Sequence, residues 1–113
     1  MAAPTYRLSM PLDVAAFSTM PWVQGGHPLE KKKTLPSRSL TLLRFEVGFE
    51  DPEWCVHGHH IFVVSGRFAL RLEGDAVHEL GAGDACVLDP GTAHRALNPG
   101  NTPVELFVLS TAP

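Results

Sequence analysis

Residues 55–60 read Cys-Val-His-Gly-His-His, and His94 follows a Pro-Gly turn much later in the chain. Thiolate and imidazole groups are ligands that zinc, iron and nickel accept, whereas magnesium and calcium prefer shells of oxygen atoms. These residue types predict a divalent-metal site if the fold brings the two segments together. They leave open which of the three metals binds.

The elements expected to position these residues are short β-strands. Hydrophobic and polar residues alternate over residues 43–49, 68–73 and 104–109, as in half-buried strands, and residues 61–64 are apolar throughout. Shorter extended segments are expected at 76–80, 85–88 and 94–97, between turn sequences. Seven or eight short strands without a convincing helix indicate an all-β sandwich or barrel, in which distant strands can bring His59 and His94 together.

Two further segments bear on assembly. Residues 61–64 are apolar on both strand faces, so we expect both faces to be covered, and a single barrel also leaves sheet edges that a second subunit would hide. We therefore expect a homodimer. We expect residues 1–37 to form an N-terminal arm, partly packed on the barrel or on a partner subunit, and residues 38–113 to form the barrel. The lysine run at 31–33 is interpreted as a solvated edge or loop.

Composition limits the other function classes. The chain has 113 residues, enough for one domain with a modest core, and a net charge of -3. It has no basic stripe beyond the lysine run, so we expect no nucleic-acid partner. No signal peptide or long apolar segment is recognised, so we expect no membrane partner, a cytoplasmic location and two reduced thiols, Cys55 and Cys86.

The segment from Gly83 to Asn98 resembles the second sequence motif of the cupin family. That motif has a glycine, five residues, Pro-x-Gly, two residues, a histidine, three residues and an asparagine; this chain matches it except that Asp89 replaces the proline. Residues 59–66 resemble the end of the first motif, in a degraded form. The resemblance implies a small single-domain, RmlC-like cupin, a double-stranded β-helix of the jelly-roll type.

The resemblance also implies a ligand set, in two alternative alignments. Cupins of the ordinary kind hold one metal with His-x-His, a glutamate and a later histidine. Anchored on Gly66, those four positions fall on Glu53, Cys55, His59 and His94. The other alignment takes His57 and His59 as the His-x-His pair, with His94 as third ligand and no carboxylate. Both keep His59 and His94, and they differ in whether Cys55 or His57 is the third ligand.

Other residues near the candidate ligands are not expected to bind the metal in most cases, and each has its own interpretation. Strand alternation directs His60 to the face opposite His59. Cys86 lies in the middle of a predicted strand and is interpreted as core filling. Glu53 follows Pro52 and is expected to be exposed, and Trp54 is expected to wall the mouth of a pocket.

The family resemblance leaves two functions open. One is a metal-dependent enzyme of the dioxygenase or isomerase type, in which the metal acts as a Lewis acid or oxygen binder on a small organic substrate. The alternative is a non-catalytic cupin module that binds a small ligand or a metal, because the carboxylate position of the motif is changed. Fold analogy does not choose between them. No Ser-His-Asp arrangement or phosphate-binding loop offers a third chemistry.

Overall fold

The computed structural model describes residues 12–35, 38–74 and 76–111. Within these ranges the regular structure consists mainly of β-strands, and a short 3₁₀ turn, η2 (Phe17–Thr19), precedes them. The strands are β1 (Val23–Gln24), β2 (Glu30–Leu35), β3 (Leu40–Phe45), β4 (Gly58–Ser65), β5 (Arg67–Leu72), β6 (Val77–Gly81), β7 (Ala85–Leu88), β8 (His94–Leu97) and β9 (Val104–Thr111).

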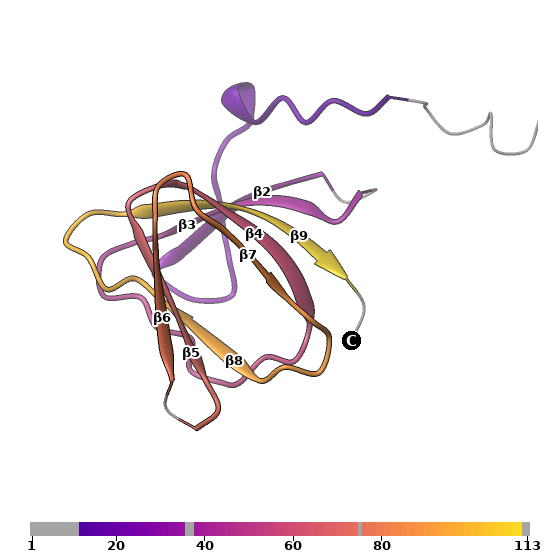
Figure 1. Ribbon diagram of the computed structural model, residues 1–113. Coiled ribbons are helices and arrows are strands. Elements are labelled where there is room, and N and C mark those ends of the chain that lie inside the picture. Colours follow the sequence, from indigo (N-terminus) through magenta and orange to yellow (C-terminus); the bar gives the residue numbers. More distant parts are fainter. Residues whose placement is uncertain (1–11, 36–37, 75, 112–113) are drawn as a thin grey trace, which may run out of the picture.

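The strands form two antiparallel sheets that face each other (Figure 1). The larger sheet has the order β1-β2-β3-β9-β4-β7, and the smaller has the order β6-β5-β8. Strands from the two halves of the sequence are therefore neighbours, as in the pairing of β3 with β9. The expected all-β jelly-roll barrel is confirmed.

The core lies between the two sheets. Ile61 pairs with Val108 and Val63 with Leu106 across β4 and β9, so alternate residues of both strands face inward. Phe68 meets them from β5 on the opposite sheet. The buried members of this core are Phe45, Phe49, Ile61, Val63, Phe68, Leu70, Leu88, Ala96, Val104, Leu106 and Val108.

The outer face of the larger sheet is only partly covered within one chain. Phe17 of η2 packs on Phe107, with ring centroids 5.8 Å apart. On β4, by contrast, the outward side chains of Phe62 and Val64 are 44% and 39% exposed. The expectation that both faces of this strand are covered is therefore wrong for the single chain, because η2 reaches only the neighbouring part of the sheet.

The lysine run lies in β2, which pairs with β3 near the edge of the larger sheet, so the loop alternative is wrong. Lys31 is exposed, as expected of a solvated edge, but Lys33 is not. Lys33 is buried under the segment from η2 to β1. Its Nζ donates a hydrogen bond to the carbonyl oxygen of Phe17 (2.7 Å) and lies 4.6 Å from the ring centre of Trp22. A carbonyl and an aromatic face together compensate for the water that the ammonium loses.

Part of the expected N-terminal arm is thus packed on the barrel through β1 and β2. The division of the chain at residue 37 stays a prediction. In the described part of the chain, no helix has the length and apolar character to cross a membrane. The cytoplasmic location stays a prediction, and both cysteines are free thiols, as expected.

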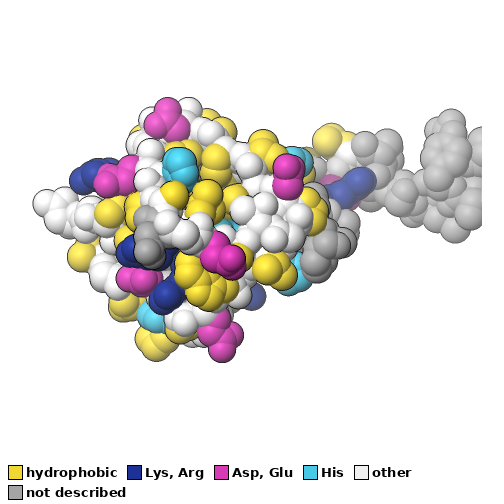
Figure 2. Space-filling model, turned by 60° about the horizontal axis from the view of Figure 1, so that its bottom comes forward, with side chains coloured by type: hydrophobic (Ala, Val, Ile, Leu, Met, Phe, Trp, Pro, Cys, Tyr) yellow, Lys and Arg dark blue, Asp and Glu magenta, His cyan; other side chains and the backbone are white. Residues whose placement is uncertain are grey.

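The surface carries mixed charge. On the face drawn in Figure 2, Lys and Arg side chains lie beside Asp and Glu side chains, among hydrophobic ones. The ion pairs of the described residues include Arg44 with Glu105 at 3.0 Å and Arg67 with Glu79. The expectation of no nucleic-acid partner stays a prediction.

Candidate metal centre

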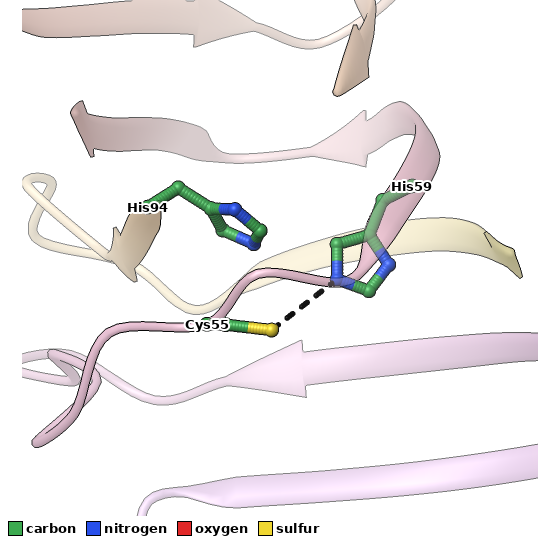
Figure 3. A group of neighbouring side chains, drawn as sticks. All are labelled: Cys55, His59 and His94. Atoms are coloured by element: carbon green, nitrogen blue, oxygen red, sulfur yellow. Dashed lines mark hydrogen bonds between the residues drawn. The ribbon is translucent and has the colours of Figure 1, made fainter. Parts of the chain in front are cut away.

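Three potential ligands meet at one end of the barrel interior. The ligand atoms of Cys55, His59 and His94 all lie within 4.8 Å of one another. Cys55 Sγ is 3.9 Å from His59 Nε2, and the two imidazole rings meet edge to face with centroids 5.2 Å apart. Figure 3 shows the three side chains converging from separate segments of backbone.

The barrel topology explains this convergence. His59 is on β4 in the larger sheet, and His94 is on β8 in the smaller one. Cys55 precedes β4 and forms an isolated bridge with His94, in which each amide donates to the other residue's carbonyl oxygen over 2.9 Å. This bridge ties the segment before β4 to the opposite sheet, so the thiol lies beside both histidines.

Hydrogen bonds orient the two imidazole rings. His94 Nδ1 is 2.9 Å from the carbonyl oxygen of Thr92. A carbonyl can only accept, so His94 Nδ1 carries the proton and Nε2 keeps its lone pair. His59 Nδ1 is 3.0 Å from the hydroxyl of Ser110, which leaves Nε2 on the side of Cys55. Metal-binding histidines are commonly fixed in this way, through the ring nitrogen that does not bind the metal.

The environment keeps His59 neutral. Burial, reinforced by the neighbouring His94 and His57, lowers the pKa of His59 to about 4. At pH 7 its imidazole is therefore uncharged, which is the form that binds metals. Protons do not compete for this nitrogen near neutral pH.

The donor set fits a transition-metal ion. In a tetrahedral zinc site, with bonds of about 2.3 Å to sulfur and 2.0 Å to nitrogen, the two donor atoms are about 3.5 Å apart. The 3.9 Å between Cys55 Sγ and His59 Nε2 is close to this separation. Three protein ligands leave a fourth position for water or a substrate, the pattern of catalytic rather than structural zinc sites.

The three donors line a cavity of about 460 Å³ inside the barrel. Its walls come from both sheets and are mostly apolar. Trp54 also lines it and is 45% exposed, in agreement with the expected place at the mouth. The apolar lining residues that lie in strands are Leu43, Phe45, Ile61, Phe68, Leu70, Ala96, Leu106 and Val108.

The remaining predicted residues lie outside the cluster. His57 and Glu53 line the cavity but are exposed, and neither joins the three donors. His60 is exposed on the outer face, as alternation predicts. Cys86 packs against the core, as expected, and burial raises the pKa of its thiol. The cluster of donors thus includes Cys55, while His57 lies outside it and acts on His59 only through its charge. The choice of third ligand stays a prediction.

Two carboxylates in the cavity were not anticipated from the sequence. Glu30 and Asp51 both line it. Burial raises the pKa of both carboxyls, and the charge of Asp51 raises that of Glu30 further. Glu30 precedes the lysine run and Asp51 precedes a proline, so local sequence suggests an edge and a turn. Only the pairing of β2 with β3, which sets Glu30 opposite Phe45, could have indicated an inward position.

Comparisons with known proteins agree with this architecture. The family model described as Cupin domain matches residues 42–110. No curated protein matches the sequence. Solved structures share the fold at low sequence identity, which is a likeness of fold alone.

Three of these structures illustrate the range. A sugar phosphate isomerase of the cupin superfamily from Silicibacter pomeroyi has 16% identity and a TM-score of 0.72, with 89% of this chain and 76% of that chain covered. The polyketide cyclase RemF from Streptomyces resistomycificus has 18% identity and a TM-score of 0.71, with coverage of 93% and 82%. The CENP-C cupin domain of Drosophila melanogaster has 18% identity and a TM-score of 0.70, with coverage of 87% and 80%.

Proposed function

This chain belongs to the cupin family, and on that premise we propose that it is a metal-dependent enzyme of the dioxygenase or isomerase type. The observation that carries the proposal is the Cys55, His59 and His94 cluster at the wall of an apolar cavity. An isomerase and a cyclase among the structural neighbours are examples of chemistry on small organic molecules in the same fold.

The chain's own residues have separate tasks in this proposal. Cys55, His59 and His94 would hold zinc, iron or nickel, which when bound supplies Lewis-acid or oxygen-binding chemistry. The Thr92 carbonyl and the Ser110 hydroxyl keep the Nε2 atoms of the two histidines available. The apolar walls bind the body of the substrate and exclude water from it.

One observation favours the second candidate, a non-catalytic module that binds a small ligand or a metal. In the Gly66-anchored alignment Glu53 occupies a ligand position, yet its side chain is exposed and lies outside the cluster. The site therefore lacks the carboxylate of the ordinary cupin pattern. Three protein ligands are still enough for a catalytic metal site, so we place the non-catalytic module second.

Metal content tests the proposal. Protein purified without chelators should carry about one equivalent of zinc, iron or nickel per chain, because three preorganised donors bind such ions tightly. Elemental analysis after gel filtration measures this directly. If the protein contains only trace metal and takes up none after dialysis against each of the three ions, the metal site is contradicted. The remaining candidate is then a module that binds a small ligand without metal. A loaded site that supports no turnover of any small substrate would favour the metal-binding module.

We also propose that the chain is a homodimer that pairs through the uncovered outer face of the larger sheet. Its apolar side chains on β4, β7 and β9 are 39–64% exposed in the single chain, namely Phe62, Val64, Val87 and Leu109. The segment before η2 leads away from the barrel (Figure 1), with Leu12 and Val14 exposed. Contiguous apolar surface of this kind is typical of a subunit interface.

A matched pair of substitutions tests the dimer. Light scattering at micromolar concentration should give about twice the chain mass for the unmodified protein. Val87→Glu should lower it to the mass of one chain, because a carboxylate at the interface loses its water. Val77→Glu, at an exposed valine on the other sheet, is the control and should leave the dimer intact. A monomer before any substitution, or equal effects of the two changes, would argue against this interface.

A further inference from the structure

The cavity beside the three donors has an unbalanced set of ionisable groups. Among the described residues that line it, none is a lysine or an arginine. Arg95 lies behind the wall, in contact with other groups. The Arg95 guanidinium lies 5.5 Å from the Trp54 ring centre, within 3.4 Å of Glu50, and its Nε donates to the Asp51 carbonyl oxygen. The acidic residues that line the cavity are Glu30, Asp51 and Glu53.

Two of these acids are placed by the strands rather than by flexible loops. Glu30 is paired with Phe45 in the β2–β3 register and faces the same side of the sheet. Asp51 accepts a hydrogen bond from the Ala96 amide at 2.8 Å. Ala96 follows His94 by two residues on β8, a strand rise of about 7 Å. The acids thus lie within the length of one small molecule from the donor cluster.

Charge then limits what can enter. Burial and the proximity of Asp51 already disfavour the charged form of Glu30 and raise its pKa. In the metal-free cavity, a carboxylate or phosphate placed beside Glu30 and Asp51 would add a like charge, which costs free energy in a partly dehydrated site. Lys32 and Arg95 act on these acids without lining the cavity, so neither is placed to pair with the incoming anion. A hydroxyl or an ammonium group would instead donate hydrogen bonds to these carboxylates, and such charge-assisted bonds are strong.

We propose that the ligand of this cavity is a small molecule with an apolar body, and that the group lying against Glu30 and Asp51 is a hydrogen-bond-donating alcohol or amine rather than a carboxylate or phosphate. A metal held by Cys55, His59 and His94 would attract an anion to its own coordination position, so the proposal concerns only the group that meets the two carboxylates. This rests on the proposed function, in that the cavity is taken as the ligand site.

Three compounds that differ only at one end test the proposal, namely phenethylamine, 2-phenylethanol and phenylacetate. Each has a phenyl ring for the apolar walls, and the series changes the end group from cation to neutral donor to anion. Binding to chelator-treated, metal-free protein is measured by calorimetry or by NMR titration at pH 7. We expect the amine and the alcohol to bind at least about tenfold more tightly than the acid, a difference of about 1.4 kcal/mol.

Substitutions assign the selectivity to the two carboxylates. Glu30→Gln combined with Asp51→Asn keeps the side-chain shapes and an acceptor for the Ala96 amide, and should reduce the difference to less than about threefold. Glu73→Gln removes an exposed turn carboxylate and should change nothing. Phenylacetate binding as tightly as the alcohol, or no binding by any of the three, would overturn the proposal. Because the titration uses metal-free protein, its outcome is independent of whether the metal site exists.

Discussion

Replacing His59 or His94 by alanine should reduce metal affinity by more than about 100-fold while the barrel stays folded. Each residue supplies one of only three donors, and a site with three protein ligands loses several kcal/mol of binding when one is removed. Both side chains border the cavity rather than fill the core, so the two sheets keep their packing. Competition against a chromophoric chelator measures the affinity, and circular dichroism verifies the fold.

His60→Ala is the matched control for this pair. His60 follows His59 on the same strand, but it is exposed on the outer face of the sheet. Its removal should leave metal affinity within about twofold, because no donor changes. If the three alanine variants retain metal equally, the ions are bound elsewhere and the proposed centre is wrong.

The same assay separates the two alignments of the first motif. Cys55→Ser replaces a thiolate by a weak ligand and should lower affinity by at least about tenfold, because Sγ lies 3.9 Å from His59 Nε2. His57→Ala should have a smaller effect, since the exposed His57 is outside the cluster. The reverse order of effects would assign the third ligand to His57 and require the segment before β4 to move.

The histidines of this site could be predicted from sequence, and the third donor could not. His59 and His94 lie in or beside strands whose alternation places them inward, and their spacing resembles a known motif. The choice between Cys55 and His57 depends on the backbone bridge that joins Cys55 to His94 across two sheets. No local pattern encodes such a bridge, because it joins an irregular segment to a strand far along the chain.

Dependence on distant contacts also explains why strand β2 and the inward positions of Glu30 and Asp51 were not predicted. Strands with alternating hydrophobicity, such as β3 and β9, were predictable because burial on one face leaves a period of two. β2 carries three lysines, and Lys33 is buried only because Phe17 and Trp22 cover it. The inward place of Glu30 follows from the pairing of that strand. Whether a polar residue in a strand is buried or faces inward can be predicted only when its partners from distant parts of the chain are known.

The sequence also does not show which apolar side chains of a strand are exposed in the single chain. Phe62 and Val64 alternate with Ile61 and Val63, and all four are equally hydrophobic in the sequence. The structure buries one pair and exposes the other. Hydrophobicity alone therefore predicted that both faces of β4 are buried, but not which part of the molecule buries the outer face. In the proposed dimer, a second copy of the chain buries it.

Gly66→Ala should destabilise the barrel by about 3 kcal/mol, through two effects that a second glycine separates. Gly66 joins β4 to β5 with φ of 82°, a backbone conformation that costs an L-residue about 1 kcal/mol. A Cβ there would also lie 2.6 Å from the Pro103 carbonyl oxygen and 2.9 Å from Val104 Cα, so the backbone before β9 must shift.

Gly74→Ala is the control that isolates the contact, since Gly74 has φ of 91° but no atom within 4 Å of the added Cβ. We expect it to lose about 1 kcal/mol, from backbone conformation alone. Urea unfolding of the three proteins gives both values. Equal losses would show that the approach of Pro103 relaxes without cost. A larger loss at Gly66 would mean that the turn needs glycine because β9 passes directly against it.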